Sequence, residues 1–233
     1  MNQEVILVLF QVVVLVLAFS VHECAHAWTA WKLGDPTAMM LGRVTLNPLK
    51  HLDPLGSVFM PLLALVYHWP LIGWAKPTPV TARNFKNYKR DDILVTLAGP
   101  ASNLASASIA LILLVIIKHV TAGGLAAVAT AVALASNVRG IPTVGLPALF
   151  PVALFLYFVI LINLLLFIFN LIPIPPLDGS HILRHFLPYR AVQIYDRMGM
   201  IGLIILFLVG GSFIFTVFFD PLLRTFNHLL FTL

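Results

Sequence analysis

Long apolar runs alternate with short polar segments along this chain. The first run, "VILVLFQVVVLVLAFSVHECAHAWTAW", predicts a helix over 4–32 that ends at the Gly-Asp-Pro turn following it. Two further runs predict spans over about 92–119 and 148–172, and a fourth predicts a span over about 199–219. Each run reaches the length of about 20 residues that a helix needs to cross a hydrocarbon core.

The segments between these runs are less regular. Residues 37–53 mix Gly, Pro and β-branched residues, which fits a short strand or a turn region. Residues 54–74 are apolar but interrupted by two prolines, which favours a re-entrant piece within a β/re-entrant loop region over 37–90. The Ala-rich segment 122–138 is expected to span or to lie at the interface. The tail 221–233 predicts a short interfacial helix.

Composition assigns the broad class of protein. The chain is 60% hydrophobic and 10% charged, whereas soluble domains carry about 25% charged residues. We therefore expect an all-α polytopic membrane protein, with about 4–6 membrane helices plus a short membrane-associated β or re-entrant region. Residues 1–233 are expected to form a single integral-membrane domain. The lone cysteine, Cys24, excludes an intramolecular disulfide, and we interpret it as a small helix-packing residue.

The basic residues predict the topology. Eight of the fourteen Lys and Arg residues lie between Lys32 and Arg90, and three more lie within 178–197. The positive-inside rule then places both regions in the cytoplasm and the N-terminus outside, so that 54–74 enters and leaves the bilayer on one side. The alternative is that 54–74 spans fully. Because the basic residues cluster in loops, we expect a lipid bilayer as partner and no nucleic acid, despite a sequence pI of 9.6.

The first predicted helix carries candidate chemistry in "HECAH". His22 and His26 lie one helical turn apart on one face, so both imidazoles can bind one Zn²⁺ and leave a position open for water. Glu23 is adjacent and can act as general base on that zinc-bound water. Ionisable side chains at membrane depth are costly, so they indicate a functional site.

A catalytic zinc site normally has three protein ligands, so a third is expected elsewhere in the chain. Most acidic residues sit at the ends of segments, but Asp178 follows a long apolar run inside the Pro-rich stretch "FNLIPIPPLDGSHIL". Unwound backbone at membrane depth is tolerated where it lines a cavity or is buried in protein, which favours Asp178 as the third ligand. His181 and His185 have suitable chemistry too, but they lie further into the basic loop.

These motifs carry a family resemblance. "HECAH" in a first membrane helix, followed by a distal "NLIPIPPLDG", resembles the site-2 protease family of intramembrane zinc metalloproteases, peptidase family M50. The stretches "LGDPTAMMLGRVTLNPLKHLDPLGS", "GWAKPTPV" and "LAGPASN" are similar to the compact subgroup without a PDZ or CBS domain. The resemblance implies one zinc per chain on His22, His26 and Asp178, catalysis by Glu23, and cleavage of transmembrane segments of other membrane proteins.

Two asparagines have roles that stay open. Asn103 and Asn170 lie at predicted membrane depth, and in similar proteins both positions are associated with the site, which suggests that they bind the substrate backbone or an oxyanion. Hydrogen bonding between helices is the alternative. "GWAKPTPV" resembles a membrane-facing loop of the family, which could hold a substrate as an added strand. The alternative interpretation is a solvated basic loop near anionic lipid. His51 and Asp53 are expected to cap the next segment rather than bind metal.

Two other functions use similar residues. A membrane metal-ion or proton transporter also places His, Asp and Glu at membrane depth, but such a protein tends to have repeated halves, and this sequence shows no repeat. A non-catalytic relative would not need Glu23 beside the histidine pair. The protease is therefore the preferred prediction. It is expected in the plasma or inner membrane, with its site towards the cytoplasmic side. Either a regulatory membrane partner or prior trimming of the substrate is expected to gate substrate access.

Overall fold

The computed structural model describes residues 3–60, 63, 73–136, 138, 145–206 and 210–233. Within these ranges the protein is helical and has no strand. Three helices are long and apolar enough to cross a membrane, namely α1 (Gln3–Lys32), α4 (Tyr88–Val120) and α6 (Phe150–Leu171). This confirms the all-α polytopic membrane fold, and the three helices lie where the apolar runs predicted spans over 4–32, 92–119 and 148–172.

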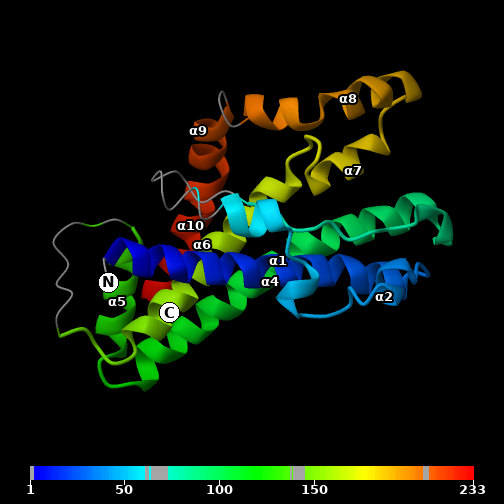
Figure 1. Ribbon diagram of the computed structural model, residues 1–233. Helices are drawn as coiled ribbons and strands as arrows, with labels where there is room; N and C mark the ends of the chain where they lie inside the picture. Colours follow the sequence, from blue (N-terminus) through cyan, green and yellow to red (C-terminus); the bar gives the residue numbers. More distant parts are fainter. Residues whose placement is uncertain (1–2, 61–62, 64–72, 137, 139–144, 207–209) are drawn as a thin grey trace.

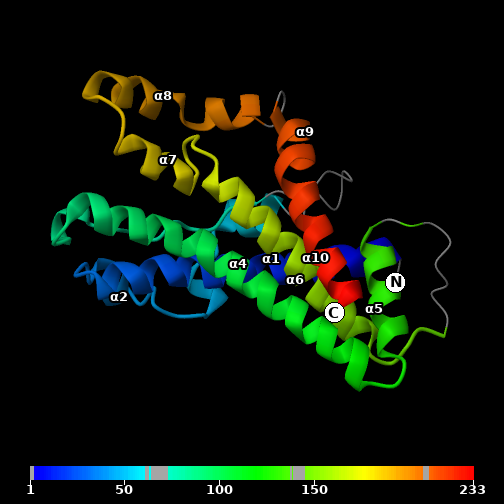
Figure 2. The same cartoon turned by 180° about the vertical axis from the view of Figure 1, so that it is seen from behind.

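The long helices α1, α4 and α6 pack against one another, and Figures 1 and 2 show α1 and α4 side by side over the half of the molecule that carries α2. Small residues line the contacts: Ala107 on α4 and Ala153 on α6 are fully buried, and Ala110 is 2% exposed. Small side chains let the helix backbones approach closely. Membrane helices associate through such close van der Waals packing, because the hydrophobic effect does not drive association within lipid.

The Ala-rich segment expected over 122–138 forms helix α5 (Gly124–Ala135). Its residues Ala127, Val128 and Ala131 are fully buried, and α5 packs against α4 and α6. A helix of this length is shorter than the about 20 residues required to cross a bilayer. The described part of the segment is therefore a packing helix beside the bundle rather than a further span.

The C-terminal helix α10 (Asp220–Thr232) also packs onto the bundle. Lys118 Nζ donates a hydrogen bond to the carbonyl oxygen of Leu230 at 2.9 Å, and His119 Nε2 lies 2.8 Å from that of Leu233. Basic side chains at a helix C-terminus satisfy its last carbonyls and favour its dipole. The tail expected over 221–233 is thus a helix held to the end of α4; its interfacial position stays a prediction.

The region between α1 and α4 consists of turns. Of the strand or turn expected over 37–53, the structure has a series of short helical turns, and one isolated antiparallel bridge, Leu52 with Ala75, is the pairing found in the described residues. Asn47 caps one turn and Asp53 caps the next, accepting from the backbone N–H groups of Leu55 and Gly56. Caps followed by proline favour helical turns over a strand, and they confirm the predicted capping role of Asp53. The turns are α2 (Thr37–Met40), η1 (Pro48–Lys50), η2 (Pro54–Phe59) and η3 (Ala82–Asn84).

Most of the predicted re-entrant piece 54–74 lies outside the described residues.

After α6 the chain continues through α7 (Asp178–Arg184) and α8 (Tyr189–Ile205), and Figures 1 and 2 both show α7 between α4 and α8. The helix backbone of α8 is interrupted at Gly199, where φ is 38°. The fourth span expected over 199–219 includes 207–209, which lie outside the described residues. Its described part consists of the end of α8, α9 (Gly211–Ile214) and η5 (Phe215–Phe219).

Candidate metal centre

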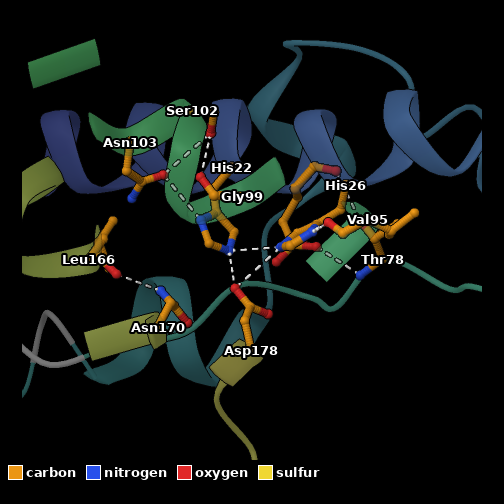
Figure 3. A network of polar contacts seen from close by, with 11 residues as sticks. His22, His26, Thr78, Val95, Gly99, Ser102, Asn103, Leu166, Asn170 and Asp178 are labelled. Carbon is orange, nitrogen blue, oxygen red and sulfur yellow. Dashed lines mark hydrogen bonds and ion pairs between the residues drawn. The ribbon is translucent and has the colours of Figure 1, made fainter. Parts of the chain in front are cut away.

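Three ligand atoms from two distant parts of the chain converge at one point (Figure 3). The Nε2 atoms of His22 and His26 lie 3.0 Å apart. Oδ2 of Asp178 lies 3.1 Å from the first and 3.4 Å from the second. Both histidines are buried, and the Asp178 side chain is 22% exposed. In the described residues this is the one group of three His, Cys, Asp or Glu side chains arranged to hold a metal ion.

Local structure explains how each ligand reaches this point. His22 and His26 are four residues apart on α1, so a regular helix places both rings on one face. Asp178 begins α7 directly after the Pro-rich stretch that ends α6. At Gly179 a Cβ atom would overlap the backbone carbonyls of Leu171 and Ile172, so the chain can turn this tightly only with glycine.

The far side of each imidazole is also held. Nδ1 of His26 lies 2.7 Å from the carbonyl oxygen of Val95, and Nδ1 of His22 lies 3.0 Å from Oδ1 of Asn103. Both partners come from α4. A carbonyl oxygen only accepts, so each Nδ1 carries the proton and each Nε2 presents a lone pair. Such outer contacts fix the tautomer and ring orientation of histidine ligands to metals.

These tautomers make the site suited to a cation. Two imidazole lone pairs and a carboxylate oxygen face one another, and Asp178 Oδ2 is a buried atom with no hydrogen-bond donor among the described residues. Three acceptors this close repel one another unless a positive charge lies between them. The separations of 3.0, 3.1 and 3.4 Å are close to the about 3.3–3.5 Å between tetrahedral ligands bonded at about 2.0–2.2 Å to zinc. The residues present therefore fit zinc.

Gly99 on α4 makes room for the two rings. A Cβ atom at this position would lie 2.6 Å from Cε1 of His22 and 2.6 Å from Cε1 of His26, which is an overlap of both rings. The stretch "LAGPASN" points to this part of α4, but the requirement for glycine follows from the crossing of α1 and α4. Sequence reasoning did not identify it.

Glu23 points to a different neighbour from the histidines. Its Oε2 accepts a hydrogen bond of 2.8 Å from the backbone N–H of Thr78, and its side chain is buried with 9% exposure. Thr78 belongs to the "GWAKPTPV" segment, and its contact with Glu23 brings that loop against α1 beside the candidate metal ligands. Sequence reasoning did not identify Thr78 or the carbonyl of Val95, and a backbone group leaves no signal in residue type.

The two asparagines differ in their surroundings. Asn103 is fully buried, and while its Oδ1 faces His22, its Nδ2 has no partner among the described residues. Asn170 donates from Nδ2 to the carbonyl of Leu166 on its own helix. Asn103 thus forms a hydrogen bond between helices α4 and α1, as the alternative expected, whereas Asn170 bonds within its own helix. Their predicted contacts with substrate stay predictions.

The other histidines considered have different partners. His185 Nε2 lies 2.7 Å from Oδ2 of Asp92, which joins the end of α7 to the beginning of α4. His51 Nε2 lies 2.8 Å from the carbonyl of Thr45. His181 is not part of the converging group either. Among the candidate third ligands, the structure thus brings Asp178 to the histidine pair.

Comparison with known proteins gives the family. The model of peptidase family M50 matches residues 10–209, which include every residue of the converging group. The chain is 39% identical over 209 residues to a Bacillus subtilis protein named "Putative zinc metalloprotease YwhC", covering 88% of this chain and 83% of that protein. It is 28% identical over 196 residues to "Putative zinc metalloprotease Rip2" of Mycobacterium tuberculosis, covering 82% of this chain and 64% of that protein. No solved structure matches the chain. A family match over most of the sequence, together with a relative of similar length, makes this chain a member of peptidase family M50 and a zinc metalloprotease.

Proposed function

We propose that this single-domain protein is an intramembrane zinc endopeptidase, which hydrolyses peptide bonds within or next to transmembrane segments of other membrane proteins. The position of the converging group along α1 carries this proposal. His26 precedes the helix end at Lys32 by six residues and His22 by ten, which is about 9 and 15 Å along the axis. The hydrocarbon core is about 30 Å thick, so a site at this depth faces transmembrane segments rather than soluble chains.

One zinc per chain, bound by His22, His26 and Asp178, is the proposed cofactor. The convergence of their Nε2 and Oδ2 atoms supports this ligand set, as do the contacts that hold Nδ1 of each histidine. Zinc, when bound, polarises a carbonyl group and lowers the pKa of a water molecule.

Glu23 is the proposed general base and acid. Its carboxylate follows His22 directly on α1, takes a proton from the attacking water, and passes it to the leaving nitrogen as the peptide bond breaks. The buried Nδ2 of Asn103 has no partner in the part of the chain that the structure describes, and it is the proposed donor to the developing oxyanion. Asn170 is the proposed contact for the substrate backbone.

The segment 73–80 is the proposed site where the substrate is held extended. A scissile bond inside a helix is protected by helix hydrogen bonds, so the substrate must unwind, and pairing with an extended edge stabilises the unwound form. This segment joins Glu23 through Thr78 and carries Trp74, which is 42% exposed. Trp at this position anchors a loop at the membrane interface.

The proposed location is the plasma or inner membrane, with the site towards the cytoplasm. Support comes from contacts that place the basic segments at one end of the bundle. Asn84 donates to Asp35 just after α1, and His185 pairs with Asp92 at the start of α4. The basic residues next to these contacts, Lys32, Arg83, Lys86, Lys89, Arg90 and Arg184, therefore share an end, which supports the orientation that the positive-inside rule gives. A regulatory membrane partner is proposed to control substrate access.

The proposed function is tested by zinc content and by cleavage of a transmembrane reporter, measured on the same purified preparations. We expect wild type to bind about one zinc and to cleave. Glu23→Gln keeps the metal and loses cleavage, whereas Asp178→Asn loses metal affinity. If wild type and Glu23→Gln cleave alike while ion flux in liposomes requires the histidine pair, a transporter explains the site and the proposal fails.

A further inference from the structure

Two contacts join Thr78 to the proposed base. The Thr78 N–H donates to Oε2 of Glu23 at 2.8 Å, and the Thr78 hydroxyl donates to the backbone carbonyl of Glu23 at 3.0 Å. One residue therefore binds Glu23 at its carboxylate and at its backbone. Figure 3 shows Thr78 approaching the site on the side of His26.

The sequence around Thr78 isolates this donor. Thr78 lies between Pro77 and Pro79, neither of which has a backbone N–H. Proline also fixes its own φ and biases the preceding residue towards extended backbone, so Lys76 and Thr78 are both held extended. Within residues 77–79 the Thr78 N–H is thus the one backbone donor, and it offers Glu23 a single, well-defined hydrogen bond.

Both ends of the segment are anchored to other parts of the protein. On one side Lys76 N–H donates to the carbonyl of His51 at 2.8 Å, next to the bridge between Leu52 and Ala75. On the other side Thr81 N–H donates at 2.7 Å to Oδ2 of Asp35, which is fully buried. The position of the Thr78 N–H is therefore set by the loop region and by the turn after α1.

The two oxygens of the Glu23 carboxylate have different surroundings. Oε2 accepts from Thr78, and among the described residues Oε1 accepts no hydrogen bond. A base that transfers a proton needs one oxygen directed at the attacking water and a fixed orientation of its carboxylate. The Thr78 N–H fixes the orientation of the carboxylate and leaves Oε1 available to face the attacking water.

We propose that Thr78 is a positioning residue of the protease, holding the Glu23 carboxylate in the orientation required for proton transfer through its isolated backbone N–H. This inference rests on the proposed role of Glu23 as general base. It predicts that loss of the N–H slows the chemical step and leaves metal binding unchanged, because neither contact involves a metal ligand.

The contact itself is tested by hydrogen exchange of the Thr78 amide in the zinc-loaded, full-length protein in detergent. The flanking prolines have no amide, so fragmentation of a peptide covering 76–80 isolates the Thr78 signal. We expect exchange to be about tenfold faster in Glu23→Ala than in wild type, the ratio that one hydrogen bond of ordinary net strength supports. Glu23→Gln retains a side-chain oxygen and is the matched control, with exchange close to wild type. Equal exchange in wild type and Glu23→Ala would overturn the proposal.

The consequence is tested by kcat, KM and zinc content of three variants. Thr78→Pro removes the N–H, and we expect kcat to fall about 100-fold with KM and zinc content near wild type. Thr78→Ser keeps both the N–H and the hydroxyl donor, so its kcat should be close to that of wild type. Thr78→Val keeps the N–H but not the hydroxyl, so its kcat should fall less than that of Thr78→Pro. Unchanged kcat in Thr78→Pro, or a parallel loss of zinc, would overturn the positioning role. Absence of cleavage by wild type counts against the proposed function, whereas the exchange result decides the contact by itself.

Discussion

Oδ1 of Asn103 on α4 lies 3.0 Å from Nδ1 of His22 on α1. Asn103 is fully buried. Its contact is with Nδ1 of His22, whereas Nε2 of the same ring faces His26 and Asp178. This contact links the orientation of a proposed metal ligand to the packing of two membrane helices.

Asn103→Ala should weaken zinc binding. The imidazole of His22 would lose the acceptor that fixes its tautomer and orientation, and changes of this kind lower metal affinity about 10–100-fold. Titration with a competing chelator measures the affinity. Asn163→Ala is the matched control, because Asn163 is a buried asparagine that donates to its own helix. Equal zinc affinities for these two variants would contradict the role of Asn103.

Gly99→Ala should abolish zinc binding. The added methyl group would overlap both imidazole rings, so either α1 and α4 separate or the rings leave the position in which their Nε2 atoms converge. Zinc content per purified chain is the measurement. Gly211→Ala serves as control, because a Cβ at Gly211 has no neighbour within 4 Å. Full zinc occupancy in Gly99→Ala would show that the site tolerates a side chain there.

Asp35→Asn should destabilise the protein in a pH-dependent way. Burial acts to raise the pKa of Asp35, but hydrogen bonds from Thr37, Thr81 and Asn84 outweigh it and hold that pKa below its ordinary value. A lowered folded-state pKa contributes stability above the unfolded pKa of about 3.9, and this contribution is lost as the pH falls through the folded value. We expect Asp35→Asn to lower the free energy of unfolding by about 2 kcal/mol at neutral pH.

Thermal unfolding of wild type and Asp35→Asn at pH 7 and at pH 3 checks this expectation. The difference between their midpoints should be larger at pH 7 and shrink at pH 3. The exposed carboxylate of Asp196, paired with Arg184 at the surface, gives a control in which Asp196→Asn has little effect. A midpoint difference independent of pH would rule out the ionised form of Asp35 as its source.

Asp92 and His185 should act together on zinc binding. Their pair, 2.7 Å apart, joins α7 to the start of α4, and α7 begins with Asp178. We expect Asp92→Asn and His185→Gln each to lower zinc affinity a few-fold, and the double variant to lose no more than the larger single effect. Chelator titration of all four proteins completes the cycle. Additive losses would mean that the two residues influence the site separately.

Sequence reasoning identified the parts of the site that residue type and helical period encode. His22 and His26 follow from four-residue spacing in an apolar run, and Asp178 follows from a carboxylate in a Pro-rich break. It did not identify Gly99, the Val95 carbonyl or Thr78, because these depend on which backbone atoms meet when α1, α4 and the loop pack together.

The fold shows the same division. Continuous apolar runs were sufficient to predict α1, α4 and α6, since length and hydropathy alone define a membrane span. Of the short strand or turn expected over 37–53, the described residues form turns. There β-branched residues suggested extended backbone, but the side-chain caps of Asn47 and Asp53, each followed by proline, favour helical turns. Local hydrogen bonding outweighed residue propensity in a region with no sheet to join.

Intramembrane cleavage is tested most directly by mapping the scissile bond in a transmembrane reporter by mass spectrometry, with the reaction run in ¹⁸O-labelled water. We expect wild type to produce a new carboxyl terminus carrying one ¹⁸O, located within or next to the transmembrane segment, and Glu23→Gln not to produce it. Cleavage confined to soluble parts of the reporter, or the same labelled product from Glu23→Gln, would contradict intramembrane proteolysis by the His22, His26 and Asp178 centre.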